Sequence, residues 1–357
     1  MVTILYSPFS IPQFIGEKKM SKKYNVVVVG IGAVGGEMVR ILDQRKFPIN
    51  QLKILARSSR EEEIGGRVYQ VTAAAEKELE GADFVFFAGT EGASGASATY
   101  LPAAKKAGAV SIDNGGDFRM DPEVPLVIPE VNPEDIRKHK GMIASPNCST
   151  IQMLVAVAPI YRESPVRRLI ASTYQAVSGT GRDAIRELRE QSPVVLSGEG
   201  EIVCSAYPHQ IAFNVLPQIG SFKEQGFTSE EWKMDRETRK MLHDDSMRIT
   251  CTAVRVPVFN GHAESVYIET EDVIPVERVR KILSSAPGVI LVDDPDNGEY
   301  PMPIDASGKD AVYVGRIRQD PHVENGLHLW IVSDNIRKGA ALNVIQIAER
   351  MIADGLV

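Results

Sequence analysis

The segment Ser145-Pro-Asn-Cys-Ser-Thr-Ile-Gln152 places a cysteine directly before an apolar stretch that continues to Ala158. Pro146 disfavours helix for the residue before it, and Asn147 is a favourable N-cap residue, so Cys148 is predicted in or next to a first helical turn. Unpaired backbone N–H groups and the helix dipole favour an anion there, which would lower the pKa of the thiol. The segment alone leaves two interpretations open: Cys148 is a nucleophile, or it is a small buried residue at a helix start.

A glycine-rich turn, Gly30-Ile-Gly-Ala-Val-Gly35, follows a β-branched run at 24–30 and precedes a helical pattern at 37–46. The run is typical of a buried parallel strand. Strand, G-x-G-x-x-G and helix in this order indicate a dinucleotide site, because the glycines let the backbone approach a pyrophosphate at the helix N-terminus. The alternative is a glycine-rich turn that binds no ligand.

Arg57 and Ser58 follow the second predicted strand, at 52–56. An NAD enzyme usually has Asp or Glu at this place for the ribose 2′-OH, whereas Arg suits the 2′-phosphate of NADP. The acidic residues at 61–63 could instead balance a basic surface turn. The residues therefore favour NADP over NAD.

Further buried strands at 83–89 and 109–114, with a helix at 96–107 between them, complete an alternating pattern. Strands that alternate with helices through short loops predict a doubly wound α/β domain of the Rossmann type. This dinucleotide-binding domain is predicted to span 24–147, so that Cys148 lies where the second domain begins.

The pattern changes after Cys148, with a strand at 167–177, charged helices from 182 and 228, and strand-like runs at 249–259 and 264–269. Asn260-Gly261 joins the last two runs and is a hairpin signal. The second domain, 148–335, is therefore predicted as α+β with a mainly antiparallel sheet. An amphipathic segment at 337–351 is expected to return to the first domain.

His262 follows the Asn-Gly pair at a predicted loop tip, and Arg255 lies seven residues earlier. A histidine and an arginine near one turn could supply a proton-transfer group and a carboxylate clamp. Taken alone, each of them is more often a surface residue. The same holds for Arg119 and for Glu231 and Lys233 in a highly charged helix.

Several motifs in order resemble the aspartate-β-semialdehyde dehydrogenase family, and in particular its bacterial branch. The motifs include Ser145-Pro-Asn-Cys-Ser-Thr-Ile-Gln152, Gln175-Ala-Val-Ser-Gly179, Arg255-Val-Pro-Val-Phe-Asn-Gly-His262 and Ser333-Asp-Asn-Ile-Arg-Lys-Gly-Ala-Ala341. The resemblance extends from Tyr24 to Val357. It implies NADPH-dependent reduction of L-aspartyl-4-phosphate to L-aspartate 4-semialdehyde through an acyl-thioester, in biosynthesis of lysine, threonine, methionine and diaminopimelate.

The resemblance also implies a role for individual residues. Cys148 matches the acyl-thioester nucleophile, His262 the general acid/base with a pKa near ~6.5, and Gln175 a residue that positions substrate and thiol. The other matches are Arg255 and Glu231 for the substrate's carboxylate and amino groups; Arg119, Lys233, Asn147 and Asn114 for phosphate; and Gly30, Ile31, Gly32, Ala33, Val34, Gly35, Arg57, Ser58, Ser178, Gly179 and Asn335 for NADP(H).

Two features depart from the family pattern. The first glycine spacing is one residue shorter, and Ile31 stands in place of a threonine, which removes one hydroxyl contact to the cofactor phosphate. The turn after the second strand is also shorter than usual, which makes the assignment of the 2′-phosphate to Arg57 and Ser58 less direct than that of the catalytic residues.

Composition narrows the function classes. At 357 residues the chain is long enough for two domains. Its net charge of −7 gives no basic footprint for nucleic acid, and no apolar run approaches a membrane span. Three scattered cysteines predict neither a disulfide framework nor a metal site and favour a reducing compartment, the cytoplasm. Residues 1–23 are predicted to be a flexible extension, with a second start at Met20.

Other enzymes with the same architecture, and a non-catalytic paralogue, are alternative interpretations. N-acetyl-γ-glutamyl-phosphate reductase has a different cysteine environment, and glyceraldehyde-3-phosphate dehydrogenase lacks the motif at Gln175. A malonyl-CoA reductase resembles another branch, and a non-catalytic paralogue would have no need of Cys148, Gln175, Arg255 and His262 together. The family implies a homodimer as the minimum assembly, and some members pair further into tetramers.

Overall fold

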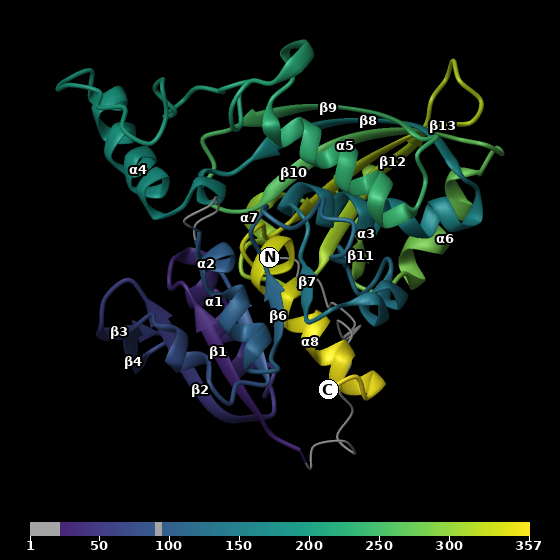
Figure 1. The fold of residues 1–357 in the computed structure, drawn as a ribbon. Coiled ribbons are helices and arrows are strands. Elements are labelled where there is room, and N and C mark those ends of the chain that lie inside the picture. Colours follow the sequence, from purple (N-terminus) through teal and green to yellow (C-terminus); the bar gives the residue numbers. More distant parts are fainter. Residues whose placement is uncertain (1–21, 90–94) are drawn as a thin grey trace.

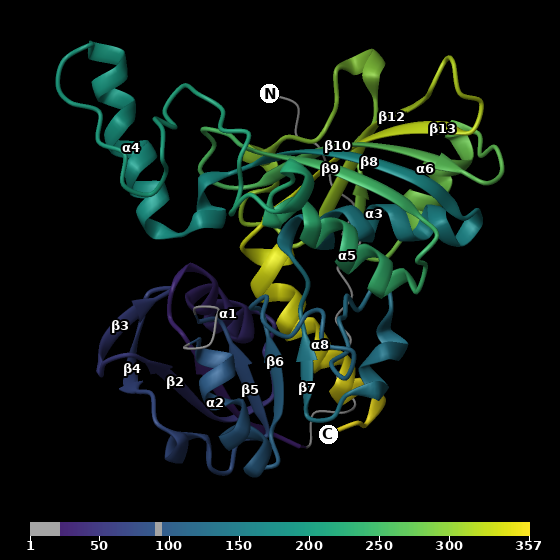
Figure 2. The ribbon, with the colours of Figure 1, turned by 45° about the horizontal axis from the view of Figure 1, so that its top comes forward.

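The computed structural model describes residues 22–89 and 95–357 and shows two sheets, each with its own helices, stacked one above the other (Figures 1 and 2). The predicted extension at 1–23 lies almost entirely outside the described residues. Among the helices of the described ranges, none has the length and apolar character to cross a membrane.

The first sheet has the strand order β3-β4-β2-β1-β5-β6-β7. Every neighbouring pair is parallel except β3 and β4, which form a hairpin. The strands are β1 (Tyr24–Val29), β2 (Ile49–Ala56), β3 (Arg60–Ile64), β4 (Arg67–Ala73), β5 (Phe84–Phe87), β6 (Val110–Asp113) and β7 (Met142–Ala144). The order turns at β1, and ligands of such sheets bind outside the carboxyl ends of the strands at this point.

Helices cover both faces of this sheet. They are α1 (Ala33–Gln44), α2 (Ala96–Lys106) and the returning α8 (Leu342–Asp354). Helix α8 contacts α1 and β6, and its buried face joins the core that β1 and β5 share with α1. The doubly wound fold class is therefore confirmed, and α8 packs on this sheet.

The second sheet has the order β11-β12-β13-β10-β8-β9 and is mixed. Its three central pairs are antiparallel, while β8 and β9, and β11 and β12, run parallel. The strands are β8 (Val166–Gln175), β9 (Arg248–Arg255), β10 (His262–Thr270), β11 (Val289–Leu291), β12 (Val312–Gln319) and β13 (Gly326–Ser333). The mainly antiparallel α+β prediction is thus confirmed.

The predicted hairpin across Asn260-Gly261 is wrong. Strands β9 and β10 do not pair, because β8 lies between them and runs parallel to β9. Long-range pairing with β8 decides the register, and the local turn signal has no influence on it. As a result His262 is the first residue of β10 and is fully buried, where a loop tip was expected.

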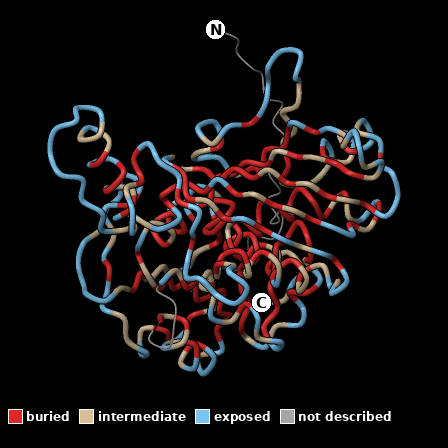
Figure 3. Tube along the Cα trace, turned by 90° about the horizontal axis from the view of Figure 1, so that it is seen from above, coloured by how far each residue is buried: buried red, intermediate tan, exposed pale blue. Residues whose placement is uncertain are grey.

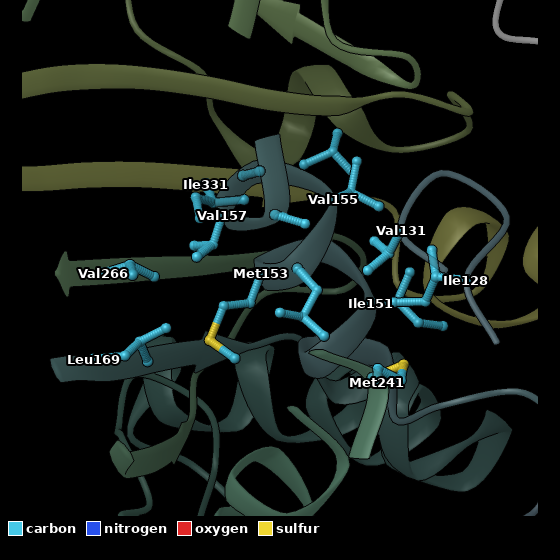
Figure 4. Packing of buried hydrophobic residues seen from close by; sticks show 14 of the residues in the cluster. Ile128, Val131, Ile151, Met153, Val155, Val157, Leu169, Met241, Val266 and Ile331 are labelled. Atoms are coloured by element: carbon cyan, nitrogen blue, oxygen red, sulfur yellow. The ribbon is translucent and has the colours of Figure 1, made fainter. Parts of the chain in front are cut away.

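Helix α3 (Cys148–Glu163) lies under the second sheet and is buried on nearly every side. A helix that is apolar all round belongs in a core. Its side chains pack against β8, β10, β13 and α5, as Figure 4 shows for Met153 and Val157 beside Leu169, Val266 and Ile331. Figure 3 shows burial along the described residues, with the buried segments gathered toward the middle of the molecule and the exposed loops around its edge. The start of α3 is therefore held rigidly.

The remaining helices belong to the second domain or link it to the first. They are α4 (Arg182–Ser197), α5 (Ser229–Leu242), α6 (Val276–Ser285), α7 (Pro303–Ala306) and a π-helical segment, η7 (Arg337–Ala341), directly before α8. Helix α4 projects away from the body at the left of Figures 1 and 2. Helices α3, α5 and η7 bring residues from distant parts of the sequence to Cys148.

Candidate active site

Cys148 is the first residue of α3 and is half-buried. The side chain of Asn147 caps the helix, with Oδ1 accepting from the backbone N–H groups of Ser149 at 3.0 Å and Thr150 at 3.3 Å. Gly339 of η7 passes so close that a Cβ there would lie 2.9 Å from the Cβ of Cys148. Only glycine permits this approach, so Cys148 is enclosed between α3 and the segment that returns to the first domain.

The ends of three strands of the second sheet supply the other expected side chains. Gln175 ends β8 directly beside Arg255 at the end of β9, and both are buried. Gly179 follows β8, and a Cβ on it would lie 2.9 Å from Nη1 of Arg255 and 3.2 Å from Nε2 of His262. The arginine and the histidine, seven residues apart in sequence, therefore face one small region.

The imidazole of His262 is fully buried and has a defined orientation. The backbone N–H of Ala176 donates to Nδ1 at 3.0 Å, while Nε2 has no hydrogen-bond partner among the described residues. Since Nδ1 accepts, the neutral ring carries its proton on Nε2. Burial, with a contribution from the charge of Arg255, lowers the pKa of His262 well below its ordinary value. The expectation of an unshifted pKa near ~6.5 is therefore wrong.

The thiol of Cys148 also differs from the expectation. Burial and, to a smaller extent, the carboxylate of Glu230 together raise its pKa to about 12, although Arg255 and Arg119 act in the opposite direction. Desolvation of the thiolate outweighs the favourable helix terminus. In the structure without substrate Cys148 is therefore a protonated thiol, although sequence reasoning predicted a lowered pKa.

The acidic residue beside Cys148 is Glu230, and the expected Glu231 points elsewhere. Glu231 completes a capping box with Thr228, and its Oε1 accepts from the backbone N–H of Ala253 at 2.9 Å. Glu230 Oε1 accepts from Asn147 Nδ2 at 2.8 Å and from Gln175 Nε2 at 3.3 Å. Side chains at adjacent helix positions point about 100° apart, so Glu230 and Glu231 face different neighbours.

The residues expected to bind phosphate come from the segment after β6, the start of α3 and helix α5. Arg119 is buried, and its Nη2 donates to the carbonyl oxygen of Asn114 at 2.7 Å. Lys233 is half-buried and lies 4.0 Å from Glu230. Asn114 is half-buried and its Oδ1 has no partner among the described residues. The side chain of Asn147 bonds to the first turn of α3 and to Glu230, and its contact with phosphate stays a prediction.

The glycine-rich turn forms a cradle at the carboxyl end of β1. Gly30 has φ of +101°, and a Cβ there would lie 2.8 Å from backbone atoms of Ala88 and Gly89. A Cβ on Gly35 would lie 1.9 Å from the carbonyl oxygen of Gly30, whereas Gly32 faces open space at the N-terminus of α1. Ile31 is buried, and Ala33 and Val34 form the first turn of α1. The shortened motif thus still leaves backbone N–H groups of α1 open to a ligand.

A cavity of about 550 Å³ connects this cradle with the second domain and is lined by Ala33, Ser178 and Ile336, among others. Ser178 and Asn335 are buried and hydrogen-bonded to each other at 3.0 Å. This is the place where a dinucleotide on the glycine turn could extend toward Cys148. Arg57 and Ser58 are exposed after β2, at the outer end of the same sheet edge.

One cation near the cradle had no sequence signal. Arg182, at the start of α4 in the second domain, donates to the carbonyl oxygen of Ile31 at 3.5 Å and lies 3.5 Å from Glu62. Only the packing of the two domains brings it beside the glycine turn.

Comparison with known proteins agrees with this geometry. Residues 25–139 match a family model described as semialdehyde dehydrogenase, NAD binding domain, and residues 157–338 match its dimerisation domain. A protein of Aquifex aeolicus named aspartate-semialdehyde dehydrogenase is 48% identical over 94% of this chain and 99% of its own length. The chain belongs to the aspartate-semialdehyde dehydrogenase family. A relative of the same name in Bacillus subtilis is 45% identical over 93% of this chain and 98% of its own length.

Solved structures of this family have the same fold. Aspartate semialdehyde dehydrogenase II of Vibrio cholerae, solved in complex with ASA, has a TM-score of 0.89 at 42% identity and covers 94% of this chain and 99% of its own. The aspartate semialdehyde dehydrogenase of Candida albicans, solved with NADP, has a TM-score of 0.71 at 22% identity, with 94% and 100% covered. The second comparison supports the fold alone.

Proposed function

We propose that this enzyme reduces L-aspartyl-4-phosphate to L-aspartate 4-semialdehyde and phosphate with NADPH, and that the residues around Cys148 carry the reaction. The observation that supports this most strongly is that Gln175, Arg255 and His262 meet at one end of the second sheet, close enough for the charge of Arg255 to act on the thiol of Cys148. Two buried donors, Arg255 Nε and His262 Nε2, have no hydrogen-bond partner among the described residues. Buried polar groups of a protein core are normally hydrogen-bonded. A bound substrate would satisfy both.

In the first step the sulfur of Cys148 attacks the acyl phosphate. The S–C bond forms, the C–O bond to phosphate breaks, and the thiol proton leaves with the phosphate. A protonated resting thiol is compatible with this balance. Arg119 and Lys233 would hold the leaving dianion, since Arg can bind it in a bidentate manner and Lys as a point charge. Covalent catalysis divides one difficult step into two easier ones.

In the second step the thioester carbon gains a hydride and its oxygen gains a proton from solvent, which gives a thiohemiacetal on Cys148. The C–S bond then breaks, the hydroxyl proton passes to the sulfur, and the aldehyde is released with the thiol restored. His262 would donate from Nε2–H to the acyl oxygen as negative charge develops on it. The N–H of Ala176 occupies Nδ1, so this neutral donor role fits the structure better than a full proton shuttle. The implied general acid/base role of His262 is revised accordingly.

NADPH supplies the hydride when it is bound. The cradle fits the close approach of a pyrophosphate, because Gly30 and Gly35 let the turn pack tightly where a side chain would collide with neighbouring backbone, and Gly32 leaves open space at the N-terminus of α1. Ser178, Gly179 and Asn335 would orient the nicotinamide end. Arg57 and Ser58 would meet the 2′-phosphate of the adenosine end.

Arg255 and Glu230 would select the amino-acid part of the substrate. Arg255 is fixed by a 2.7 Å bond from Nη1 to the carbonyl oxygen of Ala176, and its buried Nε lacks a partner within the described chain. That donor suits the α-carboxylate. Glu230 would pair with the α-ammonium group and so lose its repulsion of the thiolate of Cys148. Substrates with an acylated amine could not do this, which disfavours N-acetyl-γ-glutamyl phosphate.

Substitution of Glu230 tests this assignment. Glu230→Gln is expected to raise KM for L-aspartate semialdehyde about 10- to 100-fold, since hydrogen bonds to charged groups contribute about 1.5–3 kcal/mol. It should also speed iodoacetamide alkylation of Cys148 at a fixed pH, because removal of the carboxylate lowers the thiol pKa. The matched control is Glu231→Gln, which weakens a helix cap and should lower stability with little change in KM. A rise in KM for Glu231→Gln alone would restore the original assignment.

We further infer a cytoplasmic homodimer that forms through the second sheet. The face of this sheet opposite α3 carries Tyr174, 40% exposed, with its ring 5.5 Å from that of Trp330. Tyr300 and Met302 extend this aromatic and apolar surface beside Trp330. A second copy would bury it, and the matching family description names a dimerisation domain. Pairing of dimers into tetramers remains part of the proposal.

A substrate comparison tests the proposed reaction. The enzyme is expected to show phosphate-dependent reduction of NADP with L-aspartate semialdehyde and little reduction with N-acetylglutamate semialdehyde. Absorbance at 340 nm reports the rate, and omission of phosphate is the control. Activity with the acetylated aldehyde and none with the free amino acid would reject the proposal in favour of the acetylglutamyl-phosphate reductase alternative.

A further inference from the structure

One face of α5 carries charged residues that all reach the active site or the loop of Arg119. They stand at intervals of three and four residues, which places them along one side of a helix: Glu230, Lys233, Glu237 and Lys240. Helix α5 lies beside α3 under the second sheet (Figure 2). This stripe therefore faces protein groups near Cys148, in contrast to an ordinary solvated helix face.

Glu237 has no role in the reaction proposed above, yet it is 1% exposed and fully engaged. Its Oε1 accepts from Nη1 of Arg119 at 3.1 Å, and its Oε2 accepts from the backbone N–H of Asn147 at 2.7 Å. One carboxylate thus joins the arginine expected to hold phosphate to the residue that precedes Cys148. These groups come from positions more than 25 residues apart in every pairing, so no sequence motif contains the link.

We propose that Glu237 is a positioning residue that fixes the guanidinium of Arg119 relative to the N-terminal turn of α3, and so sets the phosphate site against the sulfur of Cys148. The proposal rests on the proposed function only in assigning phosphate to Arg119. In-line departure of phosphate requires both groups at a fixed separation, and small displacements of reacting groups reduce rates strongly. Glu237 touches neither substrate nor sulfur in this arrangement.

Lys240 supports the same loop from the same face of α5. Its Nζ donates to the carbonyl oxygens of Arg119 at 2.7 Å, Asp121 at 2.7 Å and Val124 at 2.8 Å. The backbone of Arg119 is therefore held by Lys240 and its guanidinium by Glu237. Both ends of the phosphate arginine are fixed to one helix, and the nucleophile's turn is fixed to that helix as well.

The chemistry at position 237 requires two acceptors. A glutamine would offer one acceptor oxygen, and its NH₂ group would face the N–H of Asn147 or of Arg119. Glu237→Gln is thus expected to raise KM for phosphate about 10-fold or more, as for a lost hydrogen bond to a charged group, with KM for L-aspartate semialdehyde within about 2-fold. Glu237→Asp keeps both acceptors and should recover part of the loss.

The decisive experiment is a double-mutant cycle on the full-length enzyme with inorganic phosphate as the varied substrate. If Glu237 acts through Arg119, Arg119→Gln combined with Glu237→Gln should raise KM for phosphate no more than Arg119→Gln alone. The control is Arg236→Gln on the same helix, where an exposed pair with Glu224 is lost and no kinetic change is expected. Urea unfolding of each variant separates loss of stability from loss of positioning.

Four results would overturn the proposal. An unchanged KM for phosphate in Glu237→Gln, in a wild-type background that shows phosphate-dependent activity, would reject the positioning role and leave the reaction intact. Effects of Arg119→Gln and Glu237→Gln that multiply would show independent action. Should Glu237→Gln fail to fold, Glu237→Asp with wild-type KM and kcat for every substrate at reduced stability would indicate a purely structural carboxylate. Absence of phosphate-dependent activity in the wild type would reject the proposed function and this role with it.

Discussion

Replacement of Cys148 by serine is expected to reduce the phosphate-dependent oxidation of L-aspartate semialdehyde by at least ~10⁴-fold, as for loss of other covalent nucleophiles. A serine hydroxyl is a far weaker acid than a thiol, and this site already opposes an anion through burial and through Glu230. Helix α3 keeps its cap at Asn147, so the fold should remain. The rate of NADP reduction at saturating substrates measures the effect.

Mass spectrometry tests directly for the acyl-enzyme that this prediction assumes. The wild-type enzyme with substrate should gain the mass of an aspartyl group on the peptide that contains Cys148, and Cys148→Ser should not. The matched control is Cys204→Ser, because Cys204 is an exposed free cysteine with no part in the proposed reaction. Retention of more than about a tenth of wild-type activity in Cys148→Ser would exclude an essential thioester, in conflict with the covalent mechanism.

Substitution of His262 is expected to have the second-largest effect. His262→Ala should lower kcat by about 10²–10³-fold, the range for loss of a donor to a developing oxyanion. His262→Gln retains an N–H donor and should lose less than His262→Ala. This ranking follows from the neutral ring, whose Nδ1 is occupied by the N–H of Ala176 and whose Nε2 faces the region beside Gly179.

The pH dependence distinguishes a neutral donor from a proton shuttle. Burial holds the pKa of His262 well below its ordinary value, so the ring stays uncharged as pH falls through the usual range of histidine. The rate should therefore show no acid limb near pH ~6.5. In the unfolded chain the ring takes up a proton there, so the stability contributed by the neutral ring is present above pH ~6.5 and is lost below it, toward the folded pKa.

Two measurements check this sign. Urea unfolding at pH 5 and pH 7.5 should show a smaller loss of stability at acid pH for His262→Gln than for the wild type. A kcat profile measured on the wild type and on His262→Gln should have the same shape. An acid limb near pH ~6.5 that disappears in His262→Gln would establish proton transfer by this residue and restore the general acid/base role.

Local patterns in the sequence predicted several elements because those elements depend on nearby residues. The run at β1, the glycines at Gly30 and Gly35 and the start of α1 follow from backbone sterics within twelve residues, and the structure has them. Asn147 as N-cap of α3 follows in the same way from a side chain that bonds to its own helix. Such interactions need no knowledge of the rest of the fold.

Predictions from local sequence were wrong where long-range contacts decide the structure. The Asn260-Gly261 signal is local, but β8 offers both β9 and β10 a better partner than each other, so no hairpin forms. Glu230 and Glu231 are adjacent residues of the same type, so the sequence does not tell them apart. Only the packing of α5 distinguishes them, since Glu230 contacts Asn147 and Glu231 contacts Ala253. The environment that raises the pKa of Cys148 and lowers that of His262 is also built by distant segments.

The sequence by itself determined the family, the two-domain α/β fold and the residue types of the chemistry, because these depend on local pattern and on motif identity. Only the tertiary structure decided which carboxylate faces the thiol, which nitrogen of His262 carries the proton and how Glu237 joins Arg119 to the turn of Cys148. Protonation and orientation depend on burial and on distances between segments far apart in the chain. Those quantities exist only once the chain has folded.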